Sequence, residues 1–232
     1  TCFENLLDRF NSYKKKDWID AYTTKNDKMK KQNLSGKDLA LWKFNRYIKD
    51  YLRTIQSVDD GVGELLDYLD REGLSENTIV VYTSDQGFYL GEHGWFDKRF
   101  IYDESFKTPL MIKWPNKIKP GITNDEMVQN LDFAQTFLEA AMIDVPDDMQ
   151  GESLMPLLLG ENDKWTREEV YYHYYEYPSV HMAKRHYGIV TKEFKLARFY
   201  YDVDEWELYD RYKDPNEMNN VYNDPEYTEV VE

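Results

Sequence analysis

The sequence predicts an α/β body followed by a small antiparallel subdomain, and three observations lead to this fold class. From Phe44 to Leu69, apolar residues recur every three or four positions, as they do in an amphipathic helix. A short loop then leads into the β-branched run 78–84, which indicates a strand buried on both faces of a parallel sheet. After Asp163 the chain changes to short, aromatic-rich segments at the spacing of an antiparallel sheet.

The remaining elements of the predicted body follow in order along the chain. Gly73 is placed to end the long helix in the left-handed conformation. Residues 110–114 form the next predicted strand, and residues 127–142 form a second amphipathic helix. Residues 153–159 form a short helix that ends at Gly160.

The chain divides into three predicted segments. Residues 1–43 are polar and rich in lysine, which predicts an irregular segment that packs on the α/β body. Residues 44–163 hold that body, and residues 164–232 form the small antiparallel α+β subdomain. The strands predicted in the subdomain are 170–175, 187–191, 194–199 and 206–209.

Composition excludes several classes of protein. The 232 residues carry 29 basic and 44 acidic side chains, a net charge of −15, which argues against a nucleic-acid partner or a polybasic membrane surface. No run of 18 apolar residues is present, so no membrane span is expected. Cys2 is the single cysteine, which excludes an internal disulfide and a cysteine zinc cluster. The first residue is Thr1 rather than methionine, and we expect a processed or truncated beginning.

The loop 84–99 holds the side chains best suited to chemistry. Asp85 and Gln86 place a carboxylate and an amide oxygen side by side after a buried strand, where open α/β sheets bind their ligands. Hard divalent cations take oxygen ligands of this kind. Lys98 offers a compact charge for an oxyanion, and His93 can exchange a proton near neutral pH. An ordinary polar turn is the alternative interpretation.

The same loop carries a resemblance to a known family. Residues 78–86, Gly91-Glu92-His93-Gly94 and residues 98–109 resemble the C-terminal half of a type I sulfatase of the alkaline-phosphatase superfamily. The pattern of residues is similar to that of bacterial glycan sulfatases of the N-acetylglucosamine-6-sulfatase kind. The similarity extends over nearly the whole chain from about residue 40, with further matches at 130–138, 151–154 and 206–217.

The resemblance implies a fold and a role for each matching residue. The expected fold is the C-terminal part of an alkaline-phosphatase-like sheet sandwiched by helices. Asp85 and Gln86 fall on two calcium ligands, although relatives often have Asn or His at the second position. Lys98 falls on the lysine that contacts the sulfate, and His93 is expected near the substrate. Both Lys98 and His93 are therefore predicted catalytic residues.

The family nucleophile is not encoded in these 232 residues. Such sulfatases use a formylglycine made from Cys or Ser in a Cys/Ser-x-Pro-x-Arg motif, and no such motif occurs here. Cys2 is followed by Phe3-Glu4-Asn5-Leu6 and does not match it. We expect a fragment whose missing N-terminal half supplies the formylglycine and completes the calcium site. These residues alone are then predicted to be inactive; a degenerate protein without catalysis is the alternative.

Aromatic and basic residues near the C-terminus suit a sulfated sugar. Tyrosine rings of 171–177 can pack on pyranose faces, while His181, Arg185 and His186 can pair with anions. Alternating tyrosine is equally typical of an exposed antiparallel strand, which is the favoured interpretation for His173. For His181, Arg185 and His186, substrate binding and a structural role both stay open.

Together these features predict a hydrolase of sulfate esters on a carbohydrate. The leading substrate is a 6-O-sulfated N-acetylglucosamine of glycosaminoglycans, and the resemblance implies a periplasmic or secreted enzyme. A phosphate or phosphonate ester hydrolase of the same superfamily is one alternative, against which the histidine-poor loop counts. A non-catalytic carbohydrate-binding fragment is the other.

Overall fold

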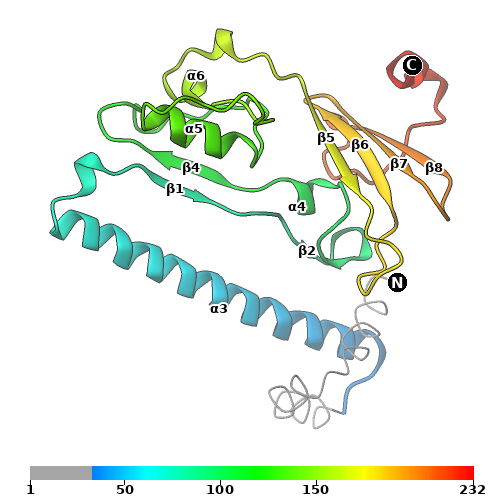
Figure 1. Ribbon diagram of the computed structural model, residues 1–232. Helices are drawn as coiled ribbons and strands as arrows, with labels where there is room; N and C mark the ends of the chain where they lie inside the picture. Colours follow the sequence, from blue (N-terminus) through cyan, green and yellow to red (C-terminus); the bar gives the residue numbers. More distant parts are fainter. Residues whose placement is uncertain (1–32) are drawn as a thin grey trace. The chain divides into compact units, whose positions relative to one another are not determined.

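The computed structural model describes residues 33–232, which its internal contacts divide into two compact units (Figure 1). Unit 1 comprises the chain up to Ser75 together with Phe88–Lys98, and unit 2 comprises Glu76–Gly87 and Arg99–Glu232. Most of the predicted irregular segment, including its lysine clusters and Cys2, lies outside the described residues. The division differs from the three predicted segments, because the body 44–163 contributes to both units.

Unit 1 is dominated by the helix α3, Gly36–Arg71, which confirms the predicted long helix. It begins eight residues earlier than expected, so residues 36–43 are helical rather than irregular. Residues 38–41 (Asp-Leu-Ala-Leu) explain the early start, because Asp38 favours a first helical turn and the next three are apolar helix formers. Gly73 ends the helix at φ +68°, as predicted.

The rest of described unit 1 is a short hairpin between β2, Tyr89–Leu90, and β3, Phe96–Asp97. A single 3₁₀ turn, Glu92–Gly94, joins the two strands. None of the helices within residues 33–232 is both long and apolar enough to cross a membrane.

The first part of unit 2 pairs two strands across a polar loop. β1, Val80–Thr83, and β4, Leu110–Lys113, confirm the two strands predicted in the body. They are antiparallel, with Val80 opposite Lys113, whereas the sequence predicts a parallel arrangement for residues 78–84. Within the described residues β1 has only this partner, and the chain between the two strands holds the β2–β3 hairpin and one short helix, Asp103–Phe106, rather than a long crossover helix.

Two helices pack against β4 and form a small core. α5 spans Asp132–Ala140 and α6 spans Met155–Leu158, so both predicted helices exist but are shorter than expected. α5 starts only at Asp132, whose carboxylate accepts from the backbone N–H of Gln129 at 2.6 Å and so holds the preceding residues in a turn outside the helix. The core joins these helices to β4 through Leu110, Ile112, Val128, Phe133, Leu154, Leu157, Leu158 and Trp165.

The second part of unit 2 is a four-stranded antiparallel sheet, as predicted (Figure 1). Its strand order follows the chain, and the 3₁₀ turn Pro225–Tyr227 and the helix α7, Thr228–Val231, come after it. Gly188 on the sheet lies close to the side chain of Ile101: a Cβ at Gly188 would stand 2.7 Å from Cδ1 of Ile101. The strands are β5, Glu169–Tyr174; β6, His186–Thr191; β7, Phe194–Phe199; and β8, Glu205–Asp210.

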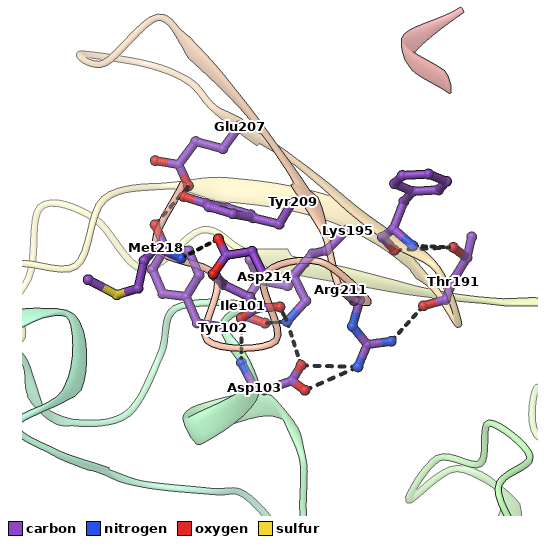
Figure 2. A network of polar contacts seen from close by, with 12 residues as sticks. Ile101, Tyr102, Asp103, Thr191, Lys195, Glu207, Tyr209, Arg211, Asp214 and Met218 are labelled. Atoms are coloured by element: carbon purple, nitrogen blue, oxygen red, sulfur yellow. Dashed lines mark hydrogen bonds and ion pairs between the residues drawn. The ribbon is translucent and has the colours of Figure 1, made fainter. Parts of the chain in front are cut away.

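A buried lysine joins this sheet to the helix α4, Asp103–Phe106 (Figure 2). Lys195 on β7 is fully buried, and its Nζ donates to the Ile101 carbonyl at 2.9 Å and to Oδ1 of Asp103 at 2.7 Å. The same Nζ lies 2.5 Å from Oε1 of Glu217, and Arg211 contacts Asp103 at 3.1 Å. One ammonium group therefore ties together β7, α4 and the C-terminal segment.

The carboxylates of this cluster differ in their electrostatics. Burial raises the pKa of Glu217 above its usual range, against the opposing effect of Lys195. Burial also acts to raise the pKa of Asp103, but Lys195 and Arg211 outweigh it and hold that pKa below its usual range. Both carboxylates depend on Lys195, because an unpaired buried charge is costly.

Replacing Lys195 by methionine should destabilise the protein by about 3–5 kcal/mol, because buried Glu217 loses its ion-pair partner and Asp103 loses one of its two. Lys192→Met is the matched control: Lys192 pairs with Glu126 at 2.7 Å but is 45% exposed, and its loss should cost at most about 1 kcal/mol. Urea unfolding of both variants measures the difference. Equal costs for the two substitutions would contradict the structural importance of the buried ammonium.

Candidate active site

The predicted metal ligands lie one residue beyond β1, on a loop with an anchored backbone. Asp85 is exposed and Gln86 is half-buried. Ser84 Oγ donates to the Gln86 carbonyl at 2.9 Å, and Asn130 Nδ2 donates to the Asp85 carbonyl at 2.9 Å. Hydrogen bonds from both sides therefore hold the backbone at these two residues.

The side chain of Gln86 is also held at its nitrogen. Nε2 donates to Oγ of Ser105, at 3.1 Å. The amide oxygen is neither buried nor hydrogen-bonded to any residue in the described part of the chain. Together with the exposed Asp85 carboxylate, this leaves two adjacent oxygen donors of the kind that a hard cation such as Ca²⁺ takes. The residues present therefore fit such an ion.

Gly87 explains why the loop can approach α4 so closely. Its N–H donates to the Ser105 carbonyl at 2.8 Å. A Cβ at this position would stand 2.1 Å from the Glu104 carbonyl oxygen, so only glycine fits without displacing the backbone. Gly87 thus serves packing between the loop and α4.

His93 and Lys98 belong to unit 1, whereas Asp85 and Gln86 belong to unit 2. His93 sits in the 3₁₀ turn at φ +51°, with its ring edge-on to Tyr89 at 6.1 Å between centroids. Lys98 follows directly on β3 and is half-buried. The meeting of all four residues around one ester stays a prediction.

Two of the three predicted substrate-binding residues are accessible in unit 2. His181 is partly exposed, and its Nε2 lies 2.8 Å from Nη2 of Arg99. Arg185 is also partly exposed and stacks over the ring of Tyr201, with 4.5 Å between its guanidinium carbon and the ring centroid. Their binding of an anionic ligand stays a prediction.

His186 occupies a different environment from the one expected. Its side chain is fully buried between the rings of Phe100 and Phe199, at centroid distances of 5.4 and 5.0 Å. Nδ1 lies 2.8 Å from the Lys184 carbonyl, and burial lowers the pKa of the imidazole to about 4. The ring has no exposed surface, which argues against the predicted substrate contact and gives His186 a place in the core.

Three residues with clear positions in this region have no role predicted from the sequence. Ser105 and Asn130 hold the loop, and both lie in stretches that carry the sulfatase resemblance. Arg99 is at φ +130°, a conformation that residues other than glycine rarely adopt. Its N–H donates to Ser105 Oγ at 2.9 Å and its carbonyl accepts from Tyr172 at 2.6 Å, so both neighbours fix that conformation.

Comparison with known proteins shows which family and which relatives this chain resembles. The family model for sulfatases matches residues 9–143, and the model for the C-terminal region of N-sulphoglucosamine sulphohydrolase matches residues 91–232. An N-acetylglucosamine-6-O-sulfatase of Bacteroides thetaiotaomicron is 52% identical over 213 residues, which cover 90% of this chain and 38% of that protein. The human N-acetylglucosamine-6-sulfatase is 37% identical over 124 residues, covering 53% of this chain and 22% of the relative.

A solved structure gives the corresponding likeness in three dimensions. It superposes with a TM-score of 0.85 at 51% identity and covers 92% of this chain and 44% of its own. That protein was crystallised in complex with its substrate, D-glucosamine-2-N,6-O-disulfate.

The fold defines a protein of the alkaline-phosphatase-like class. Within that class, the chain belongs to the sulfatase family, which confirms the resemblance seen in the sequence. It spans less than half the length of the relatives it matches.

The buried imidazole of His186 should make stability depend on pH. Its folded pKa of about 4 lies below the ordinary value of 6.5, so the unfolded chain binds the proton more readily. The free energy of unfolding should therefore fall by about 3 kcal/mol as pH drops from 6.5 to 4. His186→Phe should remove most of this loss in urea titrations, whereas His173→Phe removes only the smaller repulsion from an exposed imidazole and should leave most of the loss in place. A pH dependence identical in all three proteins would contradict the burial of a neutral imidazole.

Proposed function

We propose that the polypeptide to which this chain belongs hydrolyses sulfate monoesters on a carbohydrate. The observation that carries the proposal is 52% identity, over nine-tenths of the chain, to an N-acetylglucosamine-6-O-sulfatase. The proposed substrate is 6-O-sulfated N-acetylglucosamine of glycosaminoglycans. The similar solved structure, whose substrate is a 6-O-sulfated glucosamine, supports the same class of sugar.

Asp85 and Gln86 are the proposed calcium ligands of this chain. Their exposed carboxylate and accessible amide oxygen supply two of the six to eight oxygens that Ca²⁺ requires, and further ligands must come from elsewhere in the polypeptide. When bound, the ion would polarise the sulfate ester and offset negative charge on its oxygens. The anchored backbone of the loop keeps the two oxygens in place.

The cationic and imidazole side chains have separate proposed roles. The Lys98 ammonium would pair with the sulfate and neutralise charge that develops on its oxygens. His93 would lie near the ester oxygen, where an imidazole can hold or pass a proton. His181 and Arg185 would contact the sugar or its other anionic groups, while the buried His186 supports the fold behind them.

The nucleophile is proposed to come from outside these residues. Their sequence holds no Cys/Ser-x-Pro-x-Arg motif from which a formylglycine forms, so residues 1–232 alone should release no sulfate. Export to the periplasm or the cell exterior also stays a prediction.

The test is sulfate release by the full-length protein from 6-O-sulfated N-acetylglucosamine, with a phosphonate monoester as the competing substrate. A higher kcat/KM for the sulfated sugar, together with no turnover by residues 1–232, is the expected result. Preference for the phosphonate would favour the alternative hydrolase, and turnover by residues 1–232 alone would refute the missing nucleophile.

Lys98→Ala in the full-length protein should lower kcat/KM by about 10²–10³-fold, the usual cost of removing one group that stabilises a transition-state oxyanion. Lys107→Ala is the matched control, because Lys107 is an exposed lysine at the end of α4. Its kcat/KM should stay at the wild-type value. Equal activity of the Lys98 variant and wild type would remove Lys98 from the site.

A further inference from the structure

We propose that Ser105 is a positioning residue: its buried hydroxyl holds the Gln86 amide by its nitrogen while the amide oxygen faces the cation. This inference rests on the proposed function, because it assigns a role toward the proposed calcium ion. Ser105 itself would touch neither the ion nor the substrate.

The contacts of Ser105 connect both ends of the segment 88–98. The residue is fully buried in α4. Its carbonyl accepts from the N–H of Gly87 at 2.8 Å, and its Oγ accepts from the N–H of Arg99 at 2.9 Å. Gly87 and Arg99 are the two residues that flank this segment, so one serine holds the chain where it leaves unit 2 and where it returns.

The hydroxyl of Ser105 is able to hold the amide nitrogen of Gln86. A serine hydroxyl has two lone pairs and one proton. The Arg99 N–H occupies one lone pair, and the other accepts from Nε2 of Gln86 at 3.1 Å. The hydroxyl proton could equally bind the oxygen of a reversed amide, but that amide would turn its NH₂ group, which carries partial positive charge, toward the ion. The cation therefore selects the orientation, and the hydroxyl then holds the nitrogen behind the ligating oxygen.

Ser105 can act in this way because α4 is itself immobilised. Asp103, two residues earlier, is held by Lys195 and Arg211 and donates its backbone N–H to Glu217 Oε2 at 2.9 Å (Figure 2). The close approach of Gly87 to the Glu104 carbonyl leaves the loop no room to move toward the helix. The hydroxyl is thus a fixed reference point for the amide.

The experiment measures calcium affinity of the full-length protein by calorimetry, after removal of the ion with a chelator. Ser105→Ala should weaken calcium binding about 10- to 100-fold, as loss of a group that orients a metal ligand does. Ser105→Cys, which fills the same space with a weak acceptor, should act in the same direction and serves if the alanine variant fails to fold. Thr136→Val is the control, because Thr136 is also buried and, among residues 33–232, its hydroxyl bonds to Asp132 and Leu154 alone. Its calcium affinity should equal that of the wild type.

A second background separates orientation of the amide from general support of the loop. In Gln86→Glu, both oxygens of the carboxylate can bind the ion, so orientation no longer matters. Adding Ser105→Ala to this variant should change calcium affinity by less than about threefold. An equal loss in both backgrounds, or no loss in either, would overturn the proposal.

Sulfate release, measured in parallel, distinguishes this inference from the proposed function. If calcium affinity responds to Ser105→Ala in a protein that releases no sulfate from any ester, the proposed function fails and the role of Ser105 stands. If the wild-type protein binds no calcium, the role of Ser105 is overturned, whatever the activity.

Discussion

The buried ammonium group of Lys195 is the interaction on which the architecture of unit 2 depends. It gathers a backbone carbonyl and the carboxylates of Asp103 and Glu217 from three separate parts of the chain. Burying these charges is favourable only because each meets a partner, so no one of them can be lost cheaply. Through Asp103, the cluster fixes α4, and through Ser105, α4 fixes the loop that carries Asp85 and Gln86. The stability of the fold and the geometry of the proposed site thus share one origin.

An acidic chain that handles an anionic ester must rely on local positive charge. The net charge of −15 repels such a substrate at long range. The two most buried cations of unit 2 do not help, because Lys195 and Arg167 are each neutralised by carboxylates inside the protein. The contacts with a sulfate are therefore proposed for side chains outside these buried pairs, such as Lys98 and Arg185. Basic residues of one chain therefore have different roles: some neutralise buried carboxylates, and others offer positive charge at the surface.

The sequence predicted those elements whose pattern is local. The alternating aromatic strands after residue 164 and the helix end at Gly73 follow from periodicity and backbone preference, and the structure has both. The antiparallel direction of β1 and β4 was not predictable, because pairing depends on the path of the chain between strands. Likewise, one register position decides whether His186 faces solvent or the core, and its neighbour Arg185 points the other way.

The sequence pointed to the proposed ligands of the candidate site but not to the residues that support them. Asp85 and Gln86 are chemically conspicuous, whereas Ser105 is an ordinary serine 19 residues away from the amide that it contacts. Its importance arises from topology: the segment 88–98 leaves and re-enters unit 2 at Gly87 and Arg99, and both ends need a hydrogen-bond partner there. Because Lys98 is joined to Arg99 by a peptide bond, the serine that holds the amide also anchors the chain beside the predicted sulfate-binding lysine. A single buried hydroxyl thereby couples the two parts of the motif that the sequence shows only as neighbours along the chain.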